Sequence, residues 1–189
     1  MGSVVGKLLL VSVLLCSMAL CAQQENETDN SRRSDAHLGW PMSAPLNPTA
    51  KFAQVGTGVV YGVGYNFSRR HAVIGEFMWD WLNPRINGPA GVGNGSGSSN
   101  LYVFSGNYRF ELRGKAIGTY LIGGGGWYVR HSSLNMSSSS GAFGANGGVG
   151  FTVRVGDAPW RMYVESRYHY APTKNVNTQL IVTTIGIRY

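Results

Sequence analysis

The chain has 189 residues, of which 13% are charged and 12% are aromatic, and its formal net charge is +7 at pH 7. Average proteins carry about 25% charged residues, whereas disordered chains hold few aromatic and β-branched residues. This composition excludes a disordered chain, and the length fits one domain preceded by a targeting segment.

The basic charge is scattered along the sequence. The adjacent basic pairs are Arg32-Arg33 and Arg69-Arg70. Because a nucleic-acid interface needs a cluster or stripe of basic residues, we expect no nucleic-acid partner. A scattered positive charge fits an anionic membrane surface better.

Residues 1–22, MGSVVGKLLLVSVLLCSMALCA, have the layout of a secretory signal peptide: Lys7, a short apolar run and a small-residue region. The run is shorter than the ~20 residues of a transmembrane helix. We expect cleavage after Cys21 or Ala22. Since Cys16 and Cys21 are the two cysteines of the chain, the mature protein would hold neither a disulfide nor a thiolate metal site.

The next stretch, residues 23–48, is polar and contains Pro41, Pro45 and Pro48. Proline fixes φ and lacks a backbone N–H, so these residues are expected to form a flexible N-terminal segment. The folded domain is expected to occupy residues 49–189.

Apolar and polar residues then alternate through seven segments. In AVIGEFMWDWL, Phe77, Trp79 and Trp81 share one face, opposite Glu76 and Asp80. A period of two predicts β-strands, and no later stretch approaches a transmembrane helix in length. The seven predicted strands comprise residues 57–67, 72–82, 101–112, 116–130, 145–155, 160–170 and 179–189.

The connections between these segments alternate in length. SRRH, RGK and GDAP are tight, whereas NPRINGPAGVGNGSGSSN and HSSLNMSSSSG are long and rich in small polar residues. Short turns at one end and long loops at the other are typical of an up-and-down antiparallel β-barrel, although a soluble sandwich can also have uneven loops.

Two all-β architectures are compatible with this pattern. A soluble exported, lipocalin-like barrel would turn its apolar faces inward and could bind an apolar ligand. A transmembrane barrel would turn them toward lipid, with aromatic girdles at both interfaces. Aromatic residues near strand ends, such as Trp79, Trp81, Tyr168 and Tyr170, and opposite faces rich in glycine with few charges favour the transmembrane barrel.

The sequence also resembles a known family. The signal peptide, the alternating strands, GEFMWDWL, VESRYHY, YLIGGGGWYVR and the C-terminal aromatic residue are similar to the small bacterial outer-membrane β-barrel family related to OmpA and OmpX, over about residues 50–189. The resemblance implies bacterial outer-membrane localisation and a lipid-bilayer environment. It also implies an assembly signal in the last strand, read by the outer-membrane assembly machinery, with Ile185, Ile187 and Tyr189 on one face. The family more often ends in Phe.

A barrel with both termini in the periplasm needs an even number of strands. We therefore predict eight strands, and the sequence offers residues 36–54 for an irregular eighth strand. The prolines make this a poor strand.

Polar side chains on the inward faces are expected to fill the lumen, because a barrel of about eight strands is just wide enough for side chains. The alternative is a narrow, gated or anion-preferring pore. The expected interior polar network comprises Glu76, Asp80, Arg109, Arg154, Arg161, Glu165, Arg167, His169 and Arg188.

An enzyme is not expected. His169 and Glu165 share a strand face but lie about 13 Å apart along the strand axis, and no nucleophile motif or cofactor site accompanies them. A membrane enzyme remains a third alternative. The leading hypothesis is a structural role with presentation of surface loops, and narrow passive transport comes second. The sequence identifies no extracellular ligand.

Overall fold

The computed structural model describes residues 34–51, 53–84, 99–114, 117–132, 138–156, 158–173 and 177–189. Within these ranges, no helix has the length and apolar character needed to cross a membrane. The expected signal peptide, residues 1–22, lies outside the described residues.

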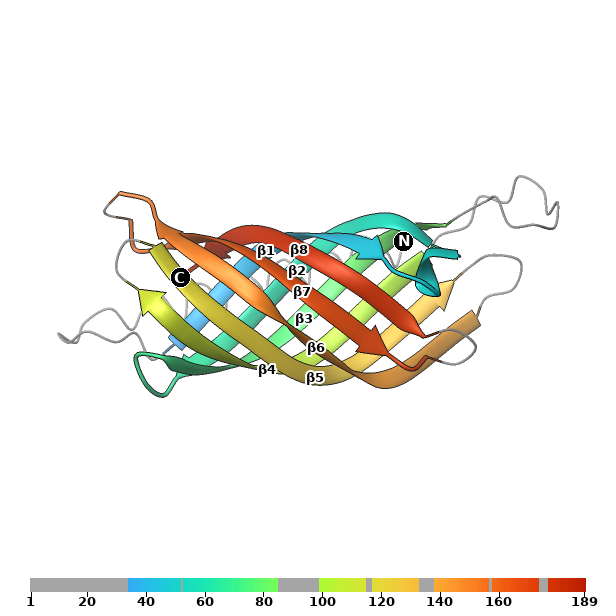
Figure 1. Cartoon of the computed structure of the whole chain (residues 1–189), viewed down its shortest axis with the longest axis horizontal. Helices are drawn as coiled ribbons and strands as arrows, with labels where there is room; N and C mark the ends of the chain where they lie inside the picture. Colours follow the sequence, from blue (N-terminus) through green and yellow to red (C-terminus); the bar gives the residue numbers. More distant parts are fainter. Residues whose placement is uncertain are drawn as a thin grey trace, which may run out of the picture.

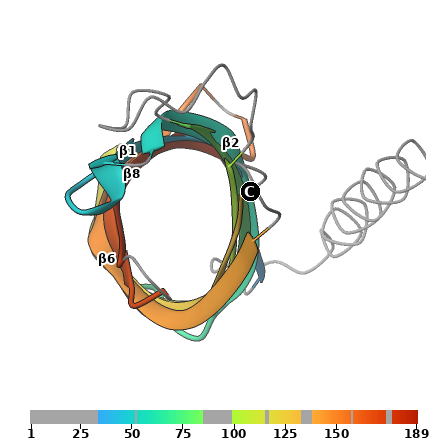
Figure 2. The same cartoon turned by 90° about the vertical axis from the view of Figure 1, so that its right-hand side faces the viewer.

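The described residues form eight strands in one closed barrel, each strand pairing with its neighbours along the chain. Figure 1 shows the strands from the side, and Figure 2 shows the closed ring along its axis. The strands are β1 (Ser34–Pro45), β2 (Ala53–Asn66), β3 (His71–Pro84), β4 (Ser99–Gly114), β5 (Ile117–Ser132), β6 (Ser138–Arg154), β7 (Arg161–Ala171) and β8 (Thr178–Arg188). The predicted fold class, an all-β up-and-down antiparallel barrel, is confirmed.

The first and last strands close the barrel. β1 pairs with β8 in antiparallel register, with Trp40 opposite Ile185. Beyond the end of β8, Tyr189 N–H donates to the Ala36 carbonyl at 2.8 Å, and Ala36 N–H donates to the Tyr189 carbonyl at 3.3 Å. The seam therefore continues to Tyr189 and leaves no unpaired sheet edge.

The two ends of the barrel differ. The turn end carries the β2–β3, β4–β5 and β6–β7 connections, together with the start of β1 and the end of β8. The loop end carries the other four connections. One of these, between β1 and β2, contains a short 3-10 helix, Thr49–Lys51. The Thr49 hydroxyl accepts a 2.8 Å hydrogen bond from the Gln179 N–H and so connects this helix to β8.

The alternation of side chains places apolar residues outside and charged residues inside. Phe143 on β6 is 67% exposed, whereas Arg167 on β7 is 5% exposed. A soluble barrel would have the reverse arrangement, since an uncovered aromatic exterior and a charged interior are both unfavourable in water. The structure thus overturns the lipocalin-like alternative.

The position of β1 corrects the expected boundary between residues 23–48 and the folded domain. Ser34–Pro45 forms a regular strand instead of part of a flexible segment, and it is the eighth strand sought within residues 36–54. Pro41 is tolerated because its pairing with β2 is interrupted there: paired positions run up to Gly39 and resume at Met42. The Thr57 hydroxyl donates to the Pro41 carbonyl at 3.1 Å and satisfies it.

The interior has two zones along its axis. The half toward the turn end holds the buried ion pairs, whereas the half toward the loop end holds a cluster of buried apolar side chains together with the buried Asp80. This apolar cluster comprises Ala53, Val60, Met78, Leu82, Leu101, Val103, Tyr128, Ala171, Leu180 and Val182.

Candidate functional site

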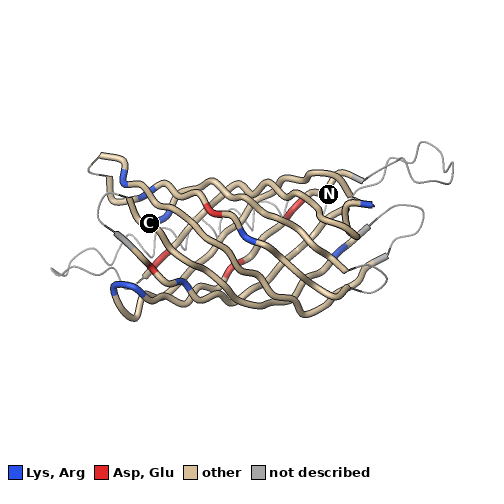
Figure 3. The backbone as a smooth tube through the Cα atoms, viewed as in Figure 1, with Lys and Arg blue, Asp and Glu red and all other residues tan. Residues whose placement is uncertain are grey.

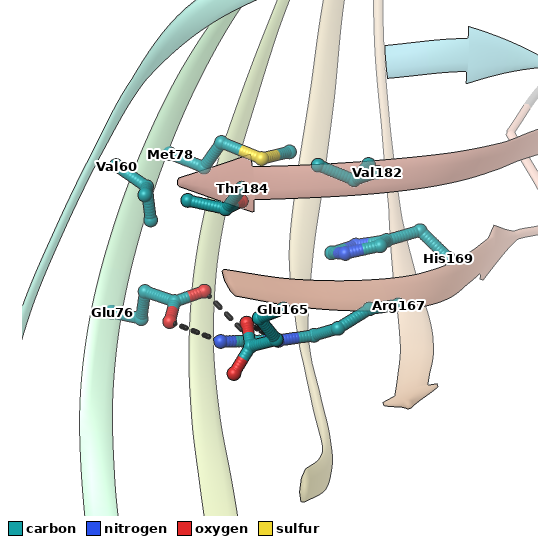
Figure 4. A pocket seen from close by; sticks show the side chains of 8 residues that line it. All are labelled: Val60, Glu76, Met78, Glu165, Arg167, His169, Val182 and Thr184. Carbon is teal, nitrogen blue, oxygen red and sulfur yellow. Dashed lines mark hydrogen bonds and ion pairs between the residues drawn. The ribbon is translucent and has the colours of Figure 1, made fainter. Parts of the chain in front are cut away.

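An ion pair between opposite walls crosses the lumen. Arg167 on β7 donates from Nη1 to Glu76 Oε1 at 2.9 Å and from Nη2 to Glu76 Oε2 at 2.7 Å, and Glu76 lies on β3. Arg167 Nε also donates to Glu165, two residues away on the same face of β7. Because β3 and β7 are separated by three strands in either direction around the barrel, this contact spans the interior (Figure 4).

His37 connects this ion pair to β1. Its Nε2 lies 3.1 Å from Glu76 Oε2, and its Nδ1 lies 4.0 Å from Asp35 Oδ1. The Tyr163 ring meets the His37 ring edge-on, with the centroids 5.7 Å apart. Gly62 provides the space, because a Cβ at that position would overlap the His37 ring.

A second group of ion pairs lies nearer the turn end. Arg109 donates to Asp35 Oδ2 at 2.6 Å, and its Nε lies 3.0 Å from Glu111 Oε1. Arg188 Nη1 donates to the same Glu111 oxygen at 3.4 Å, and its Nε lies 3.9 Å from Asp35 Oδ1. The Arg188 guanidinium also lies 4.6 Å from the centroid of the Tyr120 ring, close enough for a cation–π contact.

The two groups form one ionic core, defined as Asp35, His37, Glu76, Arg109, Glu111, Glu165, Arg167 and Arg188. Its side chains come from five strands, β1, β3, β4, β7 and β8. Buried charges are tolerated only when they are paired and hydrogen-bonded, and each aspartate, glutamate and arginine of the core lies within 4.0 Å of an oppositely charged side chain.

Neutral polar residues lie next to the ionic core. The Tyr128 hydroxyl is 2.9 Å from His169 Nδ1, and Asn146 Nδ2 donates to Asn107 Oδ1 at 2.9 Å. His169 therefore contacts Tyr128, and Glu165 contacts Arg167. The structure does not bring His169 and Glu165 together as an acid–base pair.

A small cavity lies between the ionic core and the apolar cluster. Its volume is about 10 Å³, and Glu76, Arg167 and His169 are among the side chains that line it, as Figure 4 shows. That volume is about what a single water molecule needs. The geometry offers a packed polar core, with no space for a solute at this level of the lumen.

The sequence-predicted network separates into residues that meet and residues that do not. The structure brings together Glu76, Arg109, Glu165, Arg167 and Arg188 in the ionic core and places His169 beside it. Asp80 is buried near the loop end, and no basic side chain of the described residues lies within salt-bridge distance of it. Arg154 is exposed and Arg161 half-buried, and they lie opposite each other where β6 and β7 meet the turn end.

Sequence reasoning missed the two core residues on β1, Asp35 and His37. The alternation of His37, Gly39, Pro41 and Ser43 with the apolar Leu38, Trp40 and Met42 was the signal that could have found this strand. The prolines obscured it.

The outer surface carries aromatic residues toward both ends of the strands. On the loop-end half, the ring centroids of Trp79 and Trp81 lie 4.5 Å apart. The Trp79 ring also stacks on the Tyr102 ring, with a centroid distance of 5.9 Å. On the turn-end half, the rings of Phe67 and His71 stack with their centroids 5.7 Å apart. Two aromatic belts that enclose an apolar band are typical of a transmembrane barrel.

The predicted assembly-signal residues lie on the outer face of the closing seam. Ile185 and Ile187 point outward from β8 and are exposed, and the backbone of Tyr189 pairs with Ala36. This face is accessible from the surroundings of the barrel, in contrast to the buried Arg188.

A closed eight-stranded barrel with an apolar exterior and a charged interior defines the class of transmembrane β-barrels. The family model of the outer membrane protein beta-barrel domain matches residues 12–188. The chain therefore belongs to the outer-membrane β-barrel family, which places it in the bacterial outer membrane with lipid around its barrel. The resemblance found in the sequence is confirmed.

Solved structures of similar fold come from several bacteria. Neisserial surface protein A (NspA) is 13% identical, with a TM-score of 0.59, and the match covers 82% of this chain and 94% of that chain. Ail, the attachment invasion locus protein of Yersinia pestis, is 18% identical, with a TM-score of 0.53 over 82% of this chain and 97% of Ail. The N-terminal barrel of Pseudomonas aeruginosa OprF is 12% identical, with a TM-score of 0.51, and the match covers 83% of this chain and 98% of that chain. At these identities the likeness shows the fold alone. A search of curated proteins found no match.

Proposed function

We propose that this protein is a closed outer-membrane scaffold that presents its loop-end connections at the cell surface. The observation that carries the proposal is the Arg167–Glu76 ion pair across the lumen, next to a cavity of about 10 Å³. A barrel filled in this way is rigid and offers solutes no wide passage, which leaves its connecting segments as the variable part that can act outside the membrane.

Narrow passive transport is the second candidate function. It would require the Arg167–Glu76 pair to separate, and both side chains are buried and hold further partners, Glu165 and His37. Breaking a buried ion pair is costly because it leaves charges uncompensated. This cost supports the scaffold over the pore, and we assign no catalytic role to the interior residues.

We further propose that residues 1–22 act as a cleaved signal peptide and that the last strand is read by the outer-membrane assembly machinery. The outward Ile185 and Ile187 on β8 support the second proposal, because an assembly factor could contact them before the seam with β1 closes. Mass determination of the purified mature chain tests the cleavage site.

The orientation of the barrel decides whether the loop end can face the outside. Outer-membrane barrels have short turns on the periplasmic side and longer loops on the extracellular side. Lys51 at the loop end and Arg70 at the turn end are both exposed and serve as matched positions. Since the native cysteines, Cys16 and Cys21, precede the expected cleavage site, each variant would carry one cysteine after processing.

Labelling of intact cells with a membrane-impermeant maleimide tests this orientation. Lys51→Cys is expected to react on intact cells, and Arg70→Cys only after the outer membrane is opened. The reverse pattern would contradict surface presentation of the loop end. Folding of both variants is checked by the difference in SDS mobility between unboiled and boiled samples.

A further inference from the structure

One carboxyl group lies in the lumen apart from the ionic core. Asp80 on β3 is fully buried in the half of the interior toward the loop end. Met78 and Leu82 flank it on the same face of β3, and Leu101 and Ser99 on β4 are the register partners of Asp80 and Leu82. Figure 3 shows basic residues gathered toward the other end of the barrel, where the C-terminus lies. Asp80 is thus surrounded mainly by the apolar cluster instead of by cations.

The neighbouring strand β2 closes the space around this carboxyl group. Gly58 pairs with Asp80. A Cβ at Gly58 would lie 2.8 Å from Asp80 Cα, and a Cβ at Gly56 would lie 3.0 Å from Asp80 Oδ1. The carboxyl group therefore lies directly against the glycine backbone, which leaves no room for water on that side. Ser43 on β1 pairs with Gly56 and is also buried, and its hydroxyl can hydrogen-bond to Asp80.

The nearest charged groups around Asp80 in the described ranges lie on β3 and β5. On β5, Arg130 is the register partner of Leu101, so it lies in the same row as Asp80 but two strands away, or about 10 Å between the backbones. No salt bridge joins the two side chains. On β3, the next carboxylate along this face is Glu76, which is held by Arg167. The facing residues of β1, β2 and β4 named above carry no charge, and β7 and β8 contribute apolar members of the cluster.

A proton is the partner that fits these surroundings. An ionised carboxylate among apolar side chains is so costly that such a group is neutralised instead. The neutral acid needs one acceptor for its O–H, and the Ser43 hydroxyl can supply it. A metal cation such as calcium needs several oxygen ligands, and the apolar cluster does not offer them.

We propose that Asp80 is a proton-binding group that acts as a pH-sensitive lock on the loop end of the lumen. With the proton bound, the neutral side chain packs into the apolar cluster. When the proton is lost, the charge is stabilised by moving toward water or toward the Arg130 guanidinium, and either movement separates Asp80 from Leu82 and Leu101. The loop end is therefore tighter at acidic pH and loosens as the pH rises.

Infrared spectroscopy of the folded mature chain in lipid vesicles tests for the proton, because a protonated carboxyl group has a C=O stretching band that a carboxylate lacks. The spectra are recorded at about pH 5.5, where a solvent-exposed aspartate, which titrates near pH 3.9, is ionised. We expect the band in the wild type and in Arg130→Gln, and its loss in Asp80→Asn. Absence of the band from the wild type would overturn the inference. A band that appears only in Arg130→Gln would also overturn it, since Arg130 would then be the partner of an ionised Asp80.

Amide hydrogen exchange of the same samples tests the lock itself. At about pH 9, above the range in which most buried carboxyl groups hold their proton, the wild-type amides near Trp81 are expected to exchange about tenfold faster than those of Asp80→Asn, a factor that corresponds to about 1.4 kcal/mol. At the acidic pH the two proteins should exchange alike. Comparison at equal pH cancels the intrinsic pH dependence of exchange, and amides near Val73 at the turn end serve as the internal control. Equal exchange near Trp81 at both pH values would overturn the lock.

Isotope labelling keeps the test decisive if Asp80→Asn does not fold, as judged by its SDS mobility. The wild type is then labelled with 13C at the aspartate carboxyl group, which shifts the band of a protonated aspartate and leaves that of a glutamate in place. Among the described residues the other aspartate is Asp35, which is paired with Arg109. A band that shifts on labelling supports Asp80 as the proton-binding group, and a band that does not shift would overturn the inference.

Discussion

Arg167 and Glu76 hold opposite walls of the barrel together through two hydrogen bonds of 2.9 and 2.7 Å. The contact joins β7 to β3, which share no backbone pairing. Because both side chains are buried, this contact closes the lumen at the level where it crosses.

Replacing Arg167 with Met is expected to destabilise the barrel by about 3–5 kcal/mol, because it leaves Glu76 and Glu165 buried without their shared cation. Urea unfolding in lipid vesicles measures the free energy of unfolding. Adding Glu76→Gln to the Met variant should cost less than the sum of the two single changes. Strict additivity would show that the two side chains do not interact in the membrane, and Lys51→Gln combined with Arg167→Met provides the additive control.

Removing the charge of Asp80 is expected to raise the stability of the barrel, in contrast to the loss of Arg167. Its carboxylate is fully buried and pairs with no basic side chain of the described residues, so Asp80→Asn removes an uncompensated charge and should stabilise the barrel by about 1–3 kcal/mol. The matched change Glu76→Gln, at a paired carboxylate on the same strand, should destabilise it. Equal losses in the two variants would contradict the assignment of Asp80 as unpaired.

Two glycines on different faces provide a test of interior packing. A Cβ at the inward-facing Gly62 would overlap the His37 ring, whereas a Cβ at the outward-facing Gly106 would meet no atom within 4 Å. We expect Gly62→Ala to destabilise the barrel by about 1–3 kcal/mol through overpacking, while Gly106→Ala leaves its stability nearly unchanged. Comparable unfolding curves for the two variants would show that the interior has room for a methyl group beside the His37 ring.

The exposure of Phe104 near the middle of β4 predicts a cost for charge on the outer surface. Phe104 is 56% exposed, and a lysine on the lipid face at midplane depth destabilises outer-membrane barrels by about 2–4 kcal/mol. Val155, just beyond the end of β6, is the control, because a lysine there can reach the interface at little cost. If Phe104→Lys unfolds like Val155→Lys, this face does not contact lipid.

Sequence reasoning predicted the class of fold because a period of two determines which side chains share a face. The faces of β2 and β3, with Tyr65 and Trp81 outside and Glu76 and Asp80 inside, agree with the structure. The reversed sense of the barrel could also be predicted, since few charges lay on the faces that a soluble protein would expose to water.

The individual contacts of the ionic core could not be predicted in the same way. Alternation assigns a side chain to the inside but does not give its depth, so Glu76 and Asp80 looked equivalent although only Glu76 reaches an arginine. Arg154 was assigned to the interior by its face, but it lies at the rim and is exposed. β1 was placed only approximately, within residues 36–54, because Pro41 argues against a regular strand; the interrupted pairing with β2 at Pro41 is compensated by Thr57 only in the folded barrel.

The most direct test of the closed lumen is the electrical conductance of the wild-type barrel folded into a planar lipid bilayer. We expect no current steps above those of the protein-free membrane, because the Arg167–Glu76 pair and the apolar cluster fill the interior. Reproducible steps from the wild-type protein would contradict the account and favour a narrow pore.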